Sequence, residues 1–317
     1  MTQLNKQPYE VSTSEPKPCF ILGILKRSGT NYIYRLLREH PDCIGPGPIW
    51  EDYFVHFSDA LRQFANNVYS YWSPRWEVAK RIGPQEKLMR FLGDAICRFL
   101  KLQLAVNKLN ENESKILLTK APSVRGSDYF FDFFPDCYLI VIIRDGRAVV
   151  ESGVRSFGWN YEQTMQRWKA GAQTILRLKE KCKNSNHKLL IIRYEDLFLD
   201  EKKELLKIFD VLGLDPEKYS FESTASLGVT GSSDIRKQND SVHWQVTKKA
   251  KDFDPLSRFK NWDKKRHERF NWIAGSLMAE FGYDIKQVTS NRFLYVARNW
   301  LMDIKGIFKK TLKRYIR

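Results

Sequence analysis

The sequence predicts an α/β fold in which a central parallel sheet is covered by helices on both faces. Runs of consecutive apolar residues recur along the chain, at 19–25, 115–119, 137–144 and 188–197. Segments with helical periodicity separate these runs, which is typical of parallel strands joined by right-handed crossovers. The chain has 317 residues, of which 43% are hydrophobic. It is therefore long enough to bury a large core.

The four strands differ in strength. The first, CFILGIL at 19–25, is almost wholly apolar, as expected of a strand covered on both faces. KILLT at 115–119 is shorter, and CYLIVIIR at 137–144 is the strongest because it is rich in β-branched residues. KLLIIRYEDL at 188–197 repeats the pattern of an apolar run that ends at a polar edge.

Helices are expected between and after the strands, at 29–39, about 84–108, 123–134, 145–155, 161–183, 200–212 and 263–281. Residues 221–260 are rich in Ser, Thr, Gly and charge, which is typical of a long loop. We expect a flexible segment at 1–18, one folded domain at 19–290 and a basic amphipathic tail at 291–317.

Composition restricts the partners and the compartment. The net charge of +16 indicates an anionic partner, and nucleic acid, a membrane surface, an acidic substrate or a polyanionic cofactor would each fit. The five cysteines form neither a metal-ligand pattern nor a disulfide framework, which favours a reducing compartment. The polar N-terminus has no apolar signal region, and no later stretch is long enough to span a membrane. We expect a cytoplasmic protein.

The turn after the first strand carries residues suited to an anion. It consists of Lys26, Arg27, Ser28, Gly29, Thr30 and Asn31. Ligands of open α/β sheets bind at the carboxyl ends of strands, where helix N-termini present N–H groups. Glycine allows close approach of the backbone, hydroxyl and amide side chains donate hydrogen bonds, and arginine offers a planar fork of donors.

This turn differs from the loop of nucleotide hydrolases. That loop has four residues between its glycines and a lysine after the second one. Here five residues separate Gly23 from Gly29, and Thr30 follows. The departure counts against a kinase that uses Mg-ATP.

A second strand has a similar end. The run at 137–144 ends in Arg144, and Asp145 and Gly146 then lead into a helix. Ser152 lies eight residues after Arg144, two turns into that helix if it is regular.

Together these stretches resemble a family. KRSGT at 26–30 and RDGRAVVES at 144–152 are similar to the 5′-phosphosulfate loop and the 3′-phosphate motif of sulfotransferases that use 3′-phosphoadenosine 5′-phosphosulfate (PAPS). Further segments resemble elements of tyrosylprotein and bacterial sulfotransferases: GPGPIWED at 45–52, LLTKAPS at 117–123, IIRYEDL at 191–197 and, more weakly, 231–240 and 270–284. The resemblance spans about residues 19–285 and implies the P-loop-like sulfotransferase fold.

The resemblance implies roles for the strand-end residues. Arg27 would stabilise the phosphosulfate bridge as its bond breaks, and Lys120 would reach the sulfuryl oxygens or the leaving oxygen. The segment Ser28–Asn31 would hold the 5′-phosphate, while Lys26 replaces the usual proline and either adds charge or faces solvent. Arg144 and Ser152 would bind the 3′-phosphate.

Further roles follow by the same analogy. Tyr194, Ser233 and Arg236 would contact the nucleotide. Glu51 would be the base that takes the acceptor proton, with Asp52, His56 and His243 as alternatives. The implied reaction is an in-line transfer to a hydroxyl group, and it needs no metal because fixed cations stabilise the charge.

Alternatives remain at this point. A small-molecule kinase with a P-loop-like fold would share the sheet, and a nucleic-acid-binding protein would use the basic, aromatic-containing segment at 262–272. The tail at 291–317 would dock on the domain, lie on an anionic membrane or bind a partner. The acceptor, whether a glycan, a protein tyrosine or a small alcohol or phenol, and the oligomeric state stay open.

Overall fold

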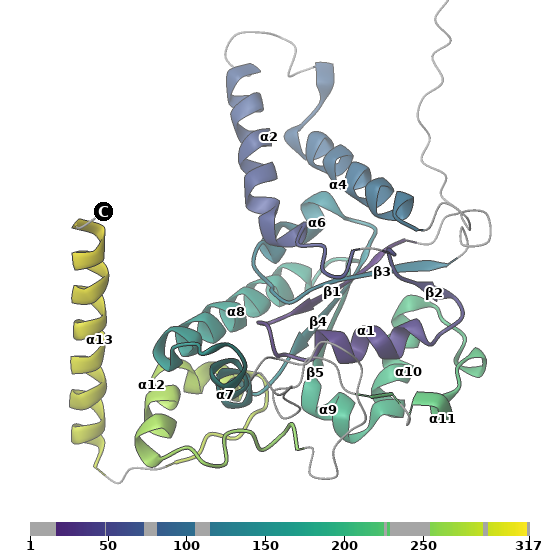
Figure 1. The fold of residues 1–317 in the computed structure, drawn as a ribbon. Coiled ribbons are helices and arrows are strands. Elements are labelled where there is room, and N and C mark those ends of the chain that lie inside the picture. The colour runs from purple at the N-terminus through teal and green to yellow at the C-terminus, as the bar shows by residue number, and fades with distance from the viewer. Residues whose placement is uncertain are drawn as a thin grey trace, which may run out of the picture.

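A computed structural model describes residues 17–47, 49–72, 81–104, 115–224, 227–228, 254–287 and 291–315. Five strands form one parallel sheet in the order β2-β3-β1-β4-β5 (Figure 1). They are β1 Cys19–Gly23, β2 Cys43–Ile44, β3 Ile116–Ala121, β4 Tyr138–Ile143 and β5 Lys188–Arg193. The α/β prediction with a parallel sheet is therefore confirmed.

Helices surround the sheet. They are α1 Thr30–Arg38, α2 Ser58–Trp72, α4 Gln85–Leu102, α6 Phe130–Phe133, α7 Gly146–Phe157, α8 Tyr161–Cys182, α9 Tyr194–Leu199, α10 Glu201–Leu212, α11 Phe221–Thr224, α12 Lys264–Glu280 and α13 Arg292–Tyr315. Short 3₁₀ turns occupy Val55–Phe57, Ser127–Tyr129 and Pro216–Lys218. Figure 1 shows α2 and α4 extending beyond one end of the sheet and α13 at the flank of the molecule.

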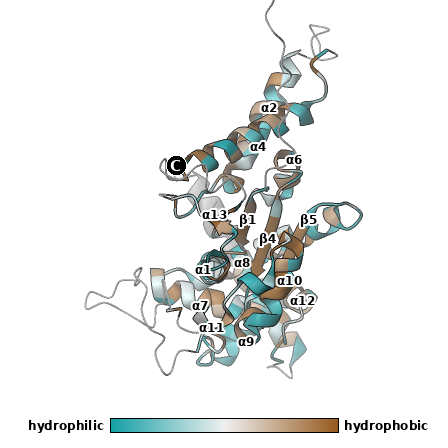
Figure 2. Ribbon diagram, turned by 90° about the vertical axis from the view of Figure 1, so that its right-hand side faces the viewer, coloured by the Kyte–Doolittle hydropathy of each residue, from teal (hydrophilic) through white to brown (hydrophobic). Residues whose placement is uncertain are grey.

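Each face of the sheet has its own apolar core, because successive strand residues point to opposite sides. Phe20 and Leu22 of β1 face the cluster that includes residues of α6, α8 and α12. Cys19 and Ile21 face the other cluster, which α1, α9 and α10 cover. The strands are the most hydrophobic elements in the middle of the fold (Figure 2), which explains why their runs are apolar throughout.

The structure corrects several expected boundaries. The segment 123–134 is not one helix, because Gly126 adopts φ 80° and only a 3₁₀ turn and the four-residue α6 follow. The run at 188–197 leaves the sheet at Arg193, and α9 begins at Tyr194. The helix expected at 84–108 ends at Leu102.

The elements that were not expected include β2 and α2. The strand β2 has only two residues, too few for a recognisable pattern. The helix α2 buries only Ser58 and Ala65 along its length, so its sequence lacks the wide apolar stripe of a helix that covers a core.

The domain limits of the prediction stay untested. The N-terminal residues 1–16 lie outside the described part of the chain, as does most of the loop expected at 221–260. Within the described ranges, no helix is both long and apolar enough to cross a bilayer.

The contact between α4 and α6 generates a prediction. A Cβ at Gly93 would lie 1.9 Å from the carbonyl oxygen of Phe133. Alanine normally stabilises a helix relative to glycine. Here we expect Gly93→Ala to lower the free energy of unfolding by about 1–3 kcal/mol, since the helix must move away from Phe133.

Denaturant unfolding of Gly93→Ala and of Asp94→Ala measures this effect. Asp94 is the exposed neighbour on the same helix, and its replacement should leave stability unchanged or raise it. Equal or greater stability of Gly93→Ala than of the wild type would contradict the close contact.

Candidate active site

The turn between β1 and α1 is shaped by its own serine. Ser28 Oγ donates a hydrogen bond to the Leu25 carbonyl at 2.6 Å and accepts one from the Leu25 N–H at 3.2 Å. The backbone turns through positive φ at Arg27 (80°) and Gly29 (98°). An arginine in this region is strained, and such strain is concentrated at functional sites. Ser28 thus holds the turn with its hydroxyl instead of presenting that hydroxyl to a ligand.

The turn leads into the N-terminus of α1. Gly29 is the N-cap residue, and no side chain caps this helix end. The first N–H groups of a helix have no acceptor within the helix. Thr30 and Asn31 therefore offer backbone donors, together with the positive end of the helix dipole, to a group in front of the turn.

Arg144 connects this turn to the end of β4. Its guanidinium donates to the carbonyl of Arg27 at 2.8 Å and to the carbonyl of Pro255. Its own carbonyl accepts a hydrogen bond of 3.1 Å from the indole N–H of Trp168. The side chain is 5% exposed, so a buried cation lies between two strand ends that are 117 residues apart in sequence.

The two predicted phosphate motifs also touch directly. Arg27 Nε donates to Ser152 Oγ at 3.0 Å, which joins the β1–α1 turn to the second turn of α7. The resemblance assigned these residues to opposite ends of one nucleotide. The contact places the two motifs side by side, and the phosphate-binding roles assigned to them stay predictions.

Tyr194 forms one wall of the site. Its ring lies 4.5 Å from the Arg144 guanidinium carbon, and a Cβ at Gly29 would lie 2.3 Å from it. A side chain at position 29 would therefore collide with the ring. Glycine is favoured at this position for that reason and also because of its φ of 98°. Tyr194 is buried, and its ring packs against the turn.

Glu195 supports the site but was not predicted. Its Oε1 accepts a 2.8 Å hydrogen bond from the Asp145 N–H, and its Oε2 accepts one of 2.8 Å from the Tyr283 hydroxyl. Burial raises the pKa of Glu195. The carboxylate thus fixes the β4–α7 turn to the start of α9 and to Tyr283 after α12. The YEDL motif draws attention to Glu195 in the sequence. It does not indicate that Glu195 contacts the turn after β4.

Asp145 stabilises the same β4–α7 turn. It caps α7 by accepting from the Arg147 N–H at 2.8 Å and pairs with the Arg147 guanidinium at 2.6 Å. Both side chains are buried. The RDGR segment therefore places Arg144 on a rigid helix entry.

Lys120, at the end of β3, is the most unusual cation. The side chain is 1% exposed, and its Nζ has no hydrogen-bond partner among the described residues. The nearest carboxylate oxygen, Glu51 Oε1, lies at 3.8 Å, and the ring of Trp50 lies 4.2 Å away. Burial lowers the pKa of Lys120 to about 8. The Lys120 ammonium is thus shielded from water and makes no hydrogen bond to another described residue.

The two neighbouring carboxylates differ in their engagement. Asp52 is used within the fold: its Oδ2 accepts from Thr119 at 2.5 Å and its Oδ1 from the Phe54 N–H at 2.8 Å. Burial raises the pKa of Asp52 to about 6. Within the described part of the chain, Glu51 accepts one hydrogen bond, from the Tyr53 hydroxyl at 2.6 Å, and it stays partly exposed.

A cavity of about 690 Å³ opens beside the turn. Its lining includes Lys26, Tyr53, His56, Pro122, Arg125 and Trp159. His56 Nε2 lies 3.5 Å from Arg125, and its pKa is lowered by burial and by this cation. The histidine is therefore neutral near pH 7.

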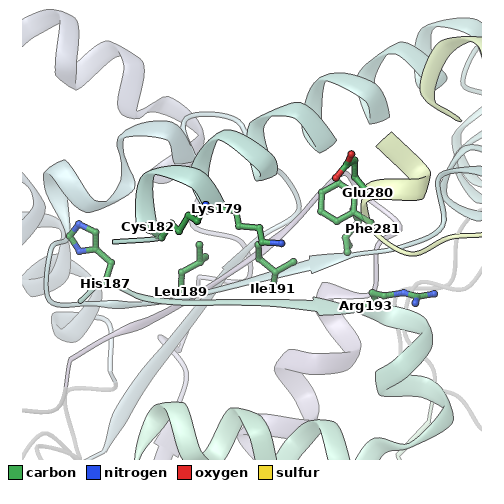
Figure 3. Close-up of a pocket in the computed structure, with 10 residues that line it drawn as sticks. Lys179, Cys182, His187, Leu189, Ile191, Arg193, Glu280 and Phe281 are labelled. Atoms are coloured by element: carbon green, nitrogen blue, oxygen red, sulfur yellow. The ribbon is translucent and has the colours of Figure 1, made fainter. Parts of the chain in front are cut away.

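A second hollow, of about 470 Å³, lies along the sheet edge (Figure 3). Leu189 and Ile191 of β5 point into it, with Lys179 of α8 and Phe281 on the far side. None of the predicted site residues lines it. Ser233, Arg236 and His243 lie outside the described residues, so their predicted roles have no structural test.

The segment before those residues is fastened near the site. Arg35 of α1 donates to the carbonyl of Gly228 at 2.6 Å. Further along the chain, the carbonyl of Pro255 accepts a hydrogen bond from the Arg144 guanidinium. Gly228 and Pro255 are therefore both held by residues of elements that form the site.

Comparison with known proteins gives a consistent result. A sequence model described as "Sulfotransferase family" matches residues 18–218. Protein-tyrosine sulfotransferase 1 of Danio rerio is 24% identical over 84% of this chain and 72% of its own length. A protein-tyrosine sulfotransferase of Drosophila melanogaster is 24% identical over 67% of the chain, which spans only 41% of that protein.

A solved structure agrees in fold. The sulfotransferase domain of the Synechococcus PCC 7002 olefin synthase has a TM-score of 0.51 and 21% identity, over 89% of this chain and 100% of that domain. At this identity the likeness shows the fold alone.

The burial of Lys120 generates a prediction about stability. A lysine whose pKa falls from 10.5 to about 8 destabilises the folded chain at pH 7 by roughly 3 kcal/mol. We expect Lys120→Met to raise the free energy of unfolding at pH 7 by about 1–3 kcal/mol. Lys188→Met, at an exposed position of β5, should have little effect.

The pH dependence separates this effect from simple packing. Because the folded chain releases the Lys120 proton at a lower pH than the unfolded chain, wild-type stability rises between about pH 8 and 10.5. The advantage of Lys120→Met should shrink through that window in urea unfolding measured at several pH values. A variant that is less stable than the wild type at pH 7 would show that the buried ammonium is not a cost.

Proposed function

Because the chain belongs to the sulfotransferase family, whose sequence model matches residues 18–218, we propose that it transfers a sulfuryl group from PAPS to a hydroxyl acceptor without a metal. One observation carries the proposal. The two cationic strand ends meet, since Arg27 donates to Ser152 at 3.0 Å and Arg144 donates to the Arg27 carbonyl at 2.8 Å. A single nucleotide with phosphates on two positions fits such a paired site.

The described residues fit a polyanionic donor. Lys120 Nζ, Arg144 Nε and Asn31 Oδ1 are buried and have no hydrogen-bond partner among these residues. A buried polar atom without a partner is costly, so such atoms indicate a polar ligand. The two nitrogens belong to cations, which supports phosphate and sulfate as the groups they hold.

Each residue would then have a definite task. The N–H groups of Gly29, Thr30 and Asn31 hold the 5′-phosphate at the start of α1. Arg144 and Ser152 bind the 3′-phosphate, and Tyr194 orders the nucleotide side of the turn. Lys26, on the exposed side of the turn, adds positive charge.

PAPS supplies an activated sulfuryl group when it is bound. Arg27 and Lys120 stabilise the negative charge that develops during in-line displacement, and the dry surroundings of Lys120 strengthen its contribution. Fixed cations are sufficient for this task because a sulfuryl group carries less negative charge than a phosphoryl group.

Glu51 is the proposed base. Its carboxylate lies 3.8 Å from Lys120 and remains accessible, whereas both oxygens of Asp52 already accept hydrogen bonds. His56 is the rival, because it is neutral near pH 7 and lines the 690 Å³ cavity. That cavity is the proposed place for the acceptor, since it is lined by His56 and by Tyr53, whose hydroxyl donates to Glu51. The residues that line the cavity do not select one acceptor, so a glycan, a phenol and a protein tyrosine stay alternative acceptors.

The donor proposal predicts selective binding. We expect 3′,5′-adenosine bisphosphate to raise the melting temperature more than AMP or ATP, because only it supplies both phosphates. A ligand at about 100 times its Kd stabilises by about 2.7 kcal/mol. Ser152→Ala should weaken 3′,5′-adenosine bisphosphate about threefold to tenfold and leave AMP unchanged, since one hydrogen bond to a charged group is lost.

Ser156→Ala is the matched control, one turn further along α7. Thermal shift titrations of both variants give the comparison. An equal response of the wild type to ATP and to 3′,5′-adenosine bisphosphate would refute the assignment and favour the kinase alternative.

The choice of base is tested by turnover. With labelled PAPS, a panel of phenol, sugar and peptide acceptors and EDTA in the buffer, we expect Glu51→Gln to lower kcat at least about 100-fold. His56→Asn should stay within about threefold of the wild type, because its ring is not needed to remove the proton. The reverse ranking would assign the base to His56, and loss of all activity in EDTA would refute metal independence.

A further inference from the structure

The C-terminal helix α13 packs on the domain with its polar side. Asn299 is fully buried, and its carbonyl and side-chain oxygens lie 3.3 and 3.4 Å from the guanidinium of Arg269 on α12. Asp303 accepts from Arg269 at 2.6 Å and from the indole of Trp272 at 2.8 Å. Arg298 of α13 pairs with Glu268, which lies on α12 next to Arg269. Ionic and hydrogen-bonded contacts thus fix the orientation of α13.

The opposite side of α13 is apolar and exposed. Phe293 is 80% exposed, Trp300 58% and Leu301 53%. Residues three, four, seven and eight apart share a face of a helix. Phe293, Ala297, Trp300, Leu301 and Ile304 therefore form one stripe, here called the outer stripe, while Asn299 and Asp303 lie on the other side.

This arrangement is the reverse of an ordinary surface helix, whose apolar side faces the core. Large side chains that gather on an exposed surface mark an interaction site. The outer stripe is held outward by the contacts of Arg269 and Glu268, so turning it inward would leave these two buried charges without their ion-pair partners on α13. In Figure 1, α13 stands at the flank of the molecule beside α12, away from the sheet.

The charge of the tail identifies the partner. Residues 291–317 contain eight Lys or Arg residues and one acidic residue, Asp303. Six of the eight lie at 305–317, where no acidic residue occurs. Two copies joined through this helix would bring two such segments together and repel each other. An anionic lipid surface would attract the basic segment by its charge, and its apolar interior would accept the outer stripe.

We propose that α13 lies on an anionic lipid surface, with the outer stripe inserted among the lipid headgroups, whose negative charge attracts the six basic residues of 305–317. Trp300 would be the main anchor, because tryptophan favours the interface between headgroup and acyl chain. Apolar insertion and basic charge together give the two signals that stable peripheral binding needs. The proposal does not depend on the proposed sulfuryl transfer.

The experiment uses the full chain and sedimentation with vesicles of phosphatidylcholine, with or without phosphatidylglycerol. We expect binding to the phosphatidylglycerol vesicles that weakens in high salt. Trp300→Gln combined with Leu301→Gln should reduce the partition coefficient at least about tenfold, because two inserted side chains are lost. Phe64→Gln combined with Tyr71→Gln is the control, since these α2 side chains are 54% and 72% exposed.

The control pair should bind vesicles as the wild type does, and all variants should keep the thermal shift with 3′,5′-adenosine bisphosphate. Absence of wild-type binding would overturn the proposal, as would equal loss in the α2 variant. Analytical ultracentrifugation covers the remaining alternative. A dimer that Trp300→Gln with Leu301→Gln dissociates, without any vesicle binding, would assign the outer stripe to a contact between copies.

Discussion

The site depends on the buried guanidinium of Arg144. Its hydrogen bonds to the carbonyls of Arg27 and Pro255 tie together the ends of β1 and β4 and the chain that returns before α12. Buried polar contacts of this kind are costly unless every partner is in place, so they restrict the loops to one arrangement. The loop at β1 keeps its positive φ at Arg27 because the surroundings are fixed in this way.

Charge is concentrated in the site at the expense of stability. Lys120 is dry and weakly paired, and Asp52 and Glu195 are carboxylates whose pKa values burial raises. A core of apolar residues would be more stable at these positions. Groups held away from water interact more strongly with a developing charge, because the dielectric screening is weaker. The apolar clusters on both faces of the sheet stabilise the fold enough to tolerate these groups.

Much of this architecture follows from local pattern. The four long strands and the helices α1, α8, α10 and α12 could be predicted because their apolar residues recur with a clear period. The helix α2 could not, since few of its residues are buried, and β2 is too short to leave a signal. At the site, the strand-end cations could be predicted from their position after apolar runs. The contacts of Glu195 with Asp145 and Tyr283 could not, because they join residues 50 and 88 positions apart, and no local rule covers such distances.

The fixed points at Gly228 and Pro255 have a consequence for how this scaffold can diversify. Arg35 holds the chain at Gly228 and Arg144 holds it at Pro255, so both fixed points contact residues next to the candidate site. The entropy of closing a loop between fixed ends grows only slowly with its length. Insertions and deletions between the two points would thus be inexpensive in folding free energy. The sequence between these points could therefore change in length while the contacts of Arg35 and Arg144 stay as they are.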